Sequence, residues 1–172
     1  MLRVHSTREE LQLREGTSRA LGFEESKDAF EGAAHIAVLA ANGSKSDGLA
    51  EGLHKGLRNA VHSLNPCDVL LPQDTPGKHD LFVIDASDAE TVQGGIFGLV
   101  SDLRARAQTR LAMQLIVAPA KRPEIAAMFF DLGADDVVPH TADAAEITLR
   151  AKRLIARKRK QDKLRDTLRN GL

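Results

Sequence analysis

Short, strongly apolar runs recur along this chain and are separated by stretches with helical periodicity. Three of them are rich in Val, Ile and Leu, namely His35–Ala40, Asp80–Asp85 and Met113–Ala118. Runs of this length and composition are typical of strands that are buried on both faces of a parallel sheet. We therefore predict an α/β domain, in which helices cover both faces of a parallel sheet.

Two shorter segments are predicted to complete the sheet. Asp68–Leu71 is expected to be the second strand along the chain, and Asp136–Pro139 the fifth. Between the first two strands, leucine or valine recurs at every third or fourth position, at Leu49, Leu53, Leu57, Val61 and Leu64. This spacing predicts an amphipathic helix that ends before Pro66.

Three later stretches have helical patterns with recognisable ends. The first helix is expected over Gly95–Arg106. The second is expected over Pro123–Leu132, where proline suits the first turn and Gly133 is a natural C-cap. The final helix is predicted to begin near Asp143 and to run past Leu168, which is longer than the cover of one sheet requires.

Composition narrows the classes of function. The 172 residues suffice for one domain, and the 24 basic and 24 acidic side chains balance, so the chain as a whole does not attract polyanions. Six Phe, with no Trp or Tyr, offer little material for stacking on bases. Cys67 is the single cysteine, so no internal disulfide forms. Because the sequence also has no signal-peptide pattern, we expect a cytoplasmic protein.

Asp85 is the candidate for chemistry, because it ends the third predicted strand. In parallel sheets, ligands and reacting groups collect at the carboxyl ends of the central strands. A carboxylate at such a position serves as a nucleophile, a metal ligand or a helix cap. We expect Ala40, Ala118 and His140 at the same edge of the sheet, since Ala40 and Ala118 end the first and fourth strands and His140 directly follows the fifth.

Three segments resemble the receiver domain of bacterial response regulators: Asp80–Asp85, Met113–Ala118 and Leu132–Val138, which reads LGADDVV. The resemblance extends over residues 35–160. It implies a flavodoxin-like (CheY-like) receiver fold, with a five-stranded parallel sheet in the order 2-1-3-4-5 and helices on both faces. It also implies that Asp85 occupies the position of the phosphorylated aspartate.

The resemblance also implies that the pocket around this aspartate is degenerate. In a typical receiver, an acidic pair follows the first strand, Thr or Ser ends the fourth, and Lys with Pro ends the fifth. The matching positions here hold Ala40, Ala41, Ala118, His140 and Thr141. Aspartyl phosphorylation needs Mg²⁺ held by several oxygen ligands, which alanine does not supply. We therefore expect no Mg²⁺, no other metal or cofactor, and no catalytic residue.

The two ends of the chain narrow the resemblance to the second (middle) receiver of PleD-type diguanylate cyclase response regulators. Residues 1–22 resemble the helix that leaves the first receiver of that family, and residues 23–34 resemble a linker. A receiver-like core over 35–142 and a long basic helix over 143–172 follow. The resemblance implies a fragment whose partners are the receiver and GGDEF domains of the same parent chain. These residues contain no GGDEF motif, so we expect no enzyme activity.

The predicted final helix carries ten Lys or Arg and two Asp between Arg150 and Arg169. Such a charge run is commonly a solvated helix face. An apolar seam along the helix is expected at Ile147, Leu154, Leu164 and Leu168. Lys158 and Gln161 interrupt the seam, so a coiled coil along it would be short. We expect the seam to meet a partner helix in a homodimer.

Three functions fit these observations. The first is a non-catalytic, receiver-like adaptor and dimerisation module, with phosphorylation sensed by a separate receiver. The second is an atypical receiver in which Asp85 is phosphorylated and His140 takes the role of the lysine. The third is a binding module whose basic final helix contacts nucleic acid or anionic membrane. The scarcity of aromatic residues and the zero net charge lead us to expect neither nucleic acid nor membrane as a partner.

Overall fold

The structure is a computed structural model and describes residues 33–40, 43–70, 79–87, 95–119 and 122–171. The chain divides into two units, Met1–Glu31 and Gly32–Leu172, and all the described residues belong to the second. The helix predicted over residues 1–22 and nearly all of the predicted linker therefore lie outside the described residues.

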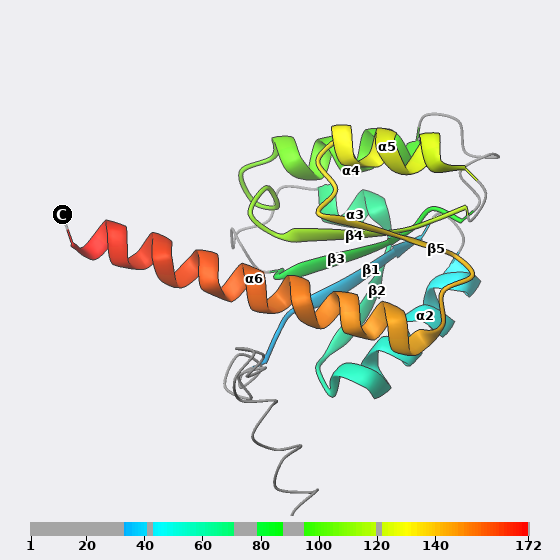
Figure 1. The fold of residues 1–172 in the computed structure, drawn as a ribbon, viewed down its shortest axis with the longest axis horizontal. Coiled ribbons are helices and arrows are strands. Elements are labelled where there is room, and N and C mark those ends of the chain that lie inside the picture. Colours follow the sequence, from blue (N-terminus) through cyan, green and yellow to red (C-terminus); the bar gives the residue numbers. More distant parts are fainter. Residues whose placement is uncertain (1–32, 41–42, 71–78, 88–94, 120–121, 172) are drawn as a thin grey trace, which may run out of the picture. The chain divides into compact units, whose positions relative to one another are not determined.

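A five-stranded parallel sheet forms the centre of the domain, with its strands in the order β2-β1-β3-β4-β5 (Figure 1). The strands are β1 (Ile36–Ala40), β2 (Val61–Leu64), β3 (Leu81–Asp85), β4 (Met113–Ala118) and β5 (Asp136–Pro139). Side chains of β1, β3 and β4 are almost entirely buried, as is usual for central strands covered on both faces. The strand order and the parallel pairing confirm the predicted fold class.

Helices cover both faces of this sheet. They are α2 (Gly43–Leu57), α3 (Pro66–Leu70), α4 (Gly95–Ala105), α5 (Pro123–Asp131) and α6 (Ala144–Asn170). Figure 1 shows α2 and α6 on one face and α3, α4 and α5 on the other. The C-terminal part of α6, coloured red, runs beyond the edge of the sheet in the same view.

The segment that follows α2 differs from the sequence-based prediction. The predicted helix included Val61 and Leu64, but α2 ends at Leu57 and those two residues belong to β2. The helix ends because Arg58 adopts a left-handed backbone conformation, with a φ of 54°. Asn59 then stabilises the turn, since its side-chain amide donates a hydrogen bond to the Leu57 carbonyl oxygen at 3.2 Å.

The predicted second strand over Asp68–Leu71 is also wrong, because Pro66–Leu70 forms the short helix α3. Pro66 stands in the first turn, where a helix does not need its missing N–H. The Asn65 side-chain oxygen accepts a hydrogen bond from the Cys67 backbone N–H at 2.9 Å. The true second strand lies at the edge of the sheet and is only half-buried, so its weak hydrophobicity did not reveal it.

The later elements confirm the sequence-based predictions closely. Both β4 and β5 have the predicted bounds. The helix α6 begins after Asp143, whose side chain accepts a hydrogen bond from the Glu146 backbone N–H at 2.7 Å. After α5, Gly133 adopts a φ of 110°, a conformation that glycine tolerates far better than other residues.

Ion pairs join two helices to the amino end of β5. Asp135 accepts hydrogen bonds from Arg104 of α4, at 2.8 Å, and from Arg157 of α6. Asp136 accepts hydrogen bonds from Arg150 of α6 at 3.0 and 3.1 Å, and this interaction raises the pKa of Arg150 above its ordinary value. The first half of α6 is therefore held to the sheet by charge pairs as well as by its apolar face.

Gln114 is a polar residue at the centre of the core. The Gln114 side chain is completely buried in β4, and its amide nitrogen donates a hydrogen bond to the Val100 carbonyl oxygen at 3.3 Å. Its side-chain oxygen is buried and has no hydrogen-bond partner among the described residues. Leaving such a group unsatisfied costs about 1–3 kcal/mol.

Replacing Gln114 with methionine is therefore expected to raise the free energy of unfolding by about 1–2 kcal/mol, because the volume is kept and the unsatisfied oxygen is removed. Urea unfolding followed by circular dichroism measures the change. Gln114→Ala is the matched control: it removes the same oxygen but leaves a cavity, so it should lower stability. A Gln114→Met variant less stable than the wild type would contradict this expectation.

Candidate functional site

Asp85 ends β3 at the carboxyl edge of the sheet. The strand register places it beside Ala40 of β1 and Val117 of β4. Its side chain is partly buried, because neighbouring strands flank it on both sides. The fold therefore brings the predicted candidate residue to the edge at which parallel sheets usually bind ligands.

The Asp85 carboxylate stabilises the turn that follows its own strand. One carboxylate oxygen accepts a hydrogen bond from the Ser87 backbone N–H at 3.0 Å. In addition, the Ala86 N–H donates to the Val117 carbonyl oxygen at 2.8 Å, which continues the pairing of β3 with β4 beyond the strand end. A carboxylate engaged in this way has a structural role that requires no metal or phosphoryl group.

The other sequence-predicted positions gather at the same edge. Ala40 ends β1, and Ala118 ends β4 with only 3% of its surface exposed. His140 follows β5 and is exposed, and its backbone N–H donates to the Ala118 carbonyl oxygen at 2.7 Å. Ala41 lies outside the described residues. The structure thus brings Asp85, Ala40, Ala118 and His140 to one edge, where both alanines offer only a methyl group.

Among the described residues, oxygen ligands for a divalent cation are scarce around Asp85. Throughout the described part of the chain, no three His, Cys, Asp or Glu side chains come together in a way that would hold a metal ion. Mg²⁺ prefers six oxygen ligands in near-octahedral geometry, commonly from carboxylates, substrate phosphates and water. The described side chains at this edge provide the Asp85 carboxylate but no second acidic group beside it in the strand register.

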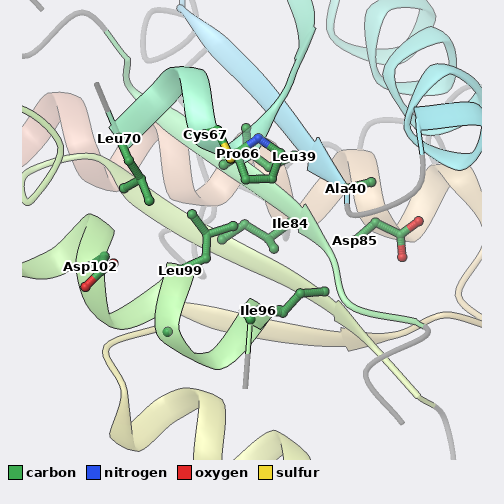
Figure 2. A pocket seen from close by; sticks show the side chains of 12 residues that line it. Leu39, Ala40, Pro66, Cys67, Leu70, Ile84, Asp85, Ile96, Leu99 and Asp102 are labelled. Atoms are coloured by element: carbon green, nitrogen blue, oxygen red, sulfur yellow. The ribbon is translucent and has the colours of Figure 1, made fainter. Parts of the chain in front are cut away.

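A pocket of about 380 Å³ lies beside Asp85, between the ends of β1 and β3 and the helices α3 and α4. Figure 2 shows Asp85 and Ala40 near one end of the pocket and Asp102 near the other. Apolar side chains dominate the lining, among them Leu39, Leu70, Ile84, Ile96 and Leu99. Such a surface suits an apolar group and does not suit a phosphoryl group, which needs hydrogen-bond donors or a cation.

Sequence reasoning missed this pocket. Cys67 and Leu70 line it because Pro66–Leu70 is a helix that lies over the sheet, whereas the sequence predicted a strand there. Asp102 reaches it from α4, in the middle of a helix that carried no evident functional pattern. The proline before Cys67 and the preceding asparagine were the signals that would have indicated a helix start.

The predicted helix seam is divided between two environments. Ile147 and Leu154 are 6% and 4% exposed, because they pack inside the domain. They therefore cannot meet a partner helix, and this part of the predicted seam is wrong. Leu164 and Leu168 are 61% and 62% exposed and lie beyond the buried part of α6.

Comparison with solved structures identifies the fold. A pilus assembly-related protein of Burkholderia pseudomallei K96243 superimposes with a TM-score of 0.60 and 17% identity, over 72% of this chain and 90% of that chain. A response regulator of Chloroflexus aurantiacus J-10-fl gives 0.56 and 17%, over 72% and 98% of the two chains. A CheY-like response regulator of Mesorhizobium loti gives 0.54 and 15%, over 72% and 99%. The chain has the receiver fold.

These likenesses establish the fold of the domain. No family model matches the sequence, and no curated protein matches it. Within the described ranges, every helix is too short or too polar to cross a lipid bilayer.

Proposed function

We propose that this chain is a non-catalytic, receiver-like adaptor of a two-component response regulator, which uses the surfaces of the receiver fold and not phosphorylation of Asp85. The observation that carries the proposal is the edge of the sheet around Asp85. There, methyl groups stand at Ala40 and Ala118, and an apolar pocket adjoins the carboxylate.

The chemistry of aspartyl phosphorylation supports this proposal. Transfer of a phosphoryl group depends on Mg²⁺ and on donors that hold the equatorial oxygens, because charge develops there in the transition state. Alanine at positions 40 and 118 provides neither a metal ligand nor a hydroxyl group. Asp85 is already a hydrogen-bond acceptor for the Ser87 N–H, so the turn itself explains its presence.

Phosphorylation tests the proposal directly. Incubation of the chain with acetyl phosphate and Mg²⁺ is expected to leave its intact mass unchanged, because no metal bridges the donor and the carboxylate. A receiver with a complete acidic pocket, treated in parallel, is the positive control. Addition of one phosphoryl group to the wild type, lost in Asp85→Asn, would contradict the proposal and support the atypical receiver in which His140 replaces the lysine.

We also propose that the parent protein is a PleD-type diguanylate cyclase response regulator, with a receiver before this chain and a GGDEF domain after it. The order of the predicted segments and the 27-residue length of α6 support this parent. Such an adaptor would be cytoplasmic and would position a domain that makes cyclic di-GMP. The coding sequence on either side tests this part, because absence of both domains would overturn it.

Within this role we propose a homodimer. Because Ile147 and Leu154 are buried, a dimer cannot use the whole predicted seam. Met128 and Phe130 of α5 are each 48% exposed, one on either side of the buried Phe129, so α5 offers an apolar side chain on each flank as an alternative contact. Nucleic acid and membrane are not part of this proposal.

A further inference from the structure

The C-terminal part of α6 is a distinct surface, which we call the distal arm and define as residues 159–170. It lies beyond the sheet in Figure 1, whereas the preceding part of α6 packs in the core through Ala151, Leu154 and Ile155. Its two leucines, Leu164 and Leu168, are the most exposed large apolar side chains among the described residues.

The leucines form one stripe along the arm, because residues four apart lie on the same side of a helix. Gln161 precedes them on this stripe, at the spacing of three and four residues that helix pairs use. Burial of a leucine side chain contributes about 1.5–3 kcal/mol, so the exposed pair favours a partner that covers it.

The charges beside this stripe are basic on both sides. Helical geometry places Lys160 on one flank and Arg165 on the other. The two acidic residues of the arm, Asp162 and Asp166, lie toward the back of the helix, and Asp162 pairs there with Lys158 and with Arg165, the latter at 2.9 Å. The arm as a whole has five Lys or Arg and two Asp.

The basic flanks oppose pairing of the distal arm with the same helix of a second copy of the chain. If two arms paired in parallel through their leucines, Lys160 of one would face Arg165 of the other, and an antiparallel pair would find no acidic residue at these flank positions. Like charges at the positions that flank a helix seam oppose pairing, and opposite charges favour it. The arm is complementary to a helix with a leucine stripe and acidic flanks.

We propose that the distal arm docks an acidic amphipathic helix of another protein or protein segment. Leu164 and Leu168 would enter the apolar stripe of this partner, while Lys160 and Arg165 would meet its acidic flanks. A DNA duplex would use the basic residues but would leave the leucines exposed. A membrane-surface helix needs a broader apolar face than two leucines provide. This inference does not depend on the adaptor role proposed above.

Fluorescence anisotropy with the full chain tests the inference. The probes are two synthetic helical peptides with the same leucine stripe, one flanked by Glu and the other by Lys. We expect the Glu-flanked peptide to bind at least tenfold more tightly than the Lys-flanked one. Leu164→Ala/Leu168→Ala should weaken its binding about tenfold or more, and Lys160→Glu/Arg165→Glu should reverse the preference between the two peptides.

Other occupants give different results, each of which would overturn the inference. Equal binding of both peptides, or no effect of the leucine substitutions, excludes a helix docked on this stripe. Tighter binding to duplex DNA or to phosphatidylserine vesicles than to the Glu-flanked peptide identifies a polyanion instead. A wild-type dimer that Leu164→Ala/Leu168→Ala dissociates in analytical ultracentrifugation identifies a second copy. None of these measurements tests phosphorylation of Asp85, so a negative result here would leave the adaptor proposal unaffected.

Discussion

Replacing Asp135 with alanine is expected to lower the free energy of unfolding by about 2–4 kcal/mol. The Asp135 side chain is only 13% exposed and pairs with Arg104 and Arg157. It also accepts the Gln114 backbone N–H at 2.9 Å. Removal of this carboxylate would leave a buried N–H without its acceptor and two guanidinium groups without their counter-ion, which explains the size of the expected effect.

The neighbouring carboxylate is the matched control for this variant. Asp136 pairs with Arg150, but its side chain is 24% exposed, compared with 13% for Asp135. Partly exposed pairs are weakened by solvent, so Asp136→Ala should cost about 1 kcal/mol or less. Urea unfolding of both variants, compared at equal m-values, measures the difference. Equal losses of stability at the two positions would contradict the central role given to Asp135.

Replacing Gly56 with alanine is expected to lower the free energy of unfolding by about 1–3 kcal/mol. A Cβ atom added at Gly56 of α2 would lie 2.5 Å from Thr148 Oγ1 and 2.7 Å from Thr148 Cγ2. Thr148 is 9% exposed and belongs to α6, so its side chain has little room to move away. The two helices would have to separate, which would disturb the packing of α6 on the domain.

Gly48→Ala is the control for this substitution, because it makes the same chemical change in the same helix. An added Cβ at Gly48 meets nothing within 4 Å, and the residue is exposed. Alanine favours the helix over glycine by about 1 kcal/mol, so this variant should gain up to that amount. Thermal unfolding of the two variants should therefore shift in opposite directions.

A double-mutant cycle would assign the loss to the predicted contact. Thr148→Ala removes the hydroxyl and methyl groups that Gly56→Ala would meet. The double variant should therefore be more stable than the sum of the two single changes by about 1 kcal/mol. Additive effects, or stabilisation by Gly56→Ala alone, would show that α2 and α6 do not depend on this close approach.

Both substitutions weaken contacts that attach α6 to the rest of the domain. Asp135 and Asp136 bind its arginines at the amino end of the sheet, while Gly56 allows α2 to approach its buried face. Together these contacts fix the part of α6 that precedes the distal arm.

Most strands and helices were predictable from sequence, because their patterns are strong and local. The predicted positions and types agree with the structure for the last three strands and the helices that follow them, which are β3, β4 and β5 with α4, α5 and α6. The region from Arg58 to Leu70 was not predictable in this way. There, an edge strand carries little apolar signal, and a short helix depends on Asn65 and Pro66 more than on any periodicity.

The candidate site was partly predictable for the same reason. A strand end locates Asp85, and the rule that parallel strands share a carboxyl edge places Ala40 and Ala118 near it. The pocket beside Asp85 was not predictable, because α3 forms one of its walls and the sequence suggested a strand there.

The sequence by itself determined the parallel sheet and the chemical content of its carboxyl edge, because runs of buried residues and strand-end side chains are local properties of the chain. Only the tertiary structure decided which apolar side chains of α6 remain exposed and can contact a partner. Ile147, Leu154, Leu164 and Leu168 look alike in the sequence, yet the first two are buried and the last two are about three-fifths exposed. The physical reason is that burial depends on where the sheet ends, which no helical periodicity records.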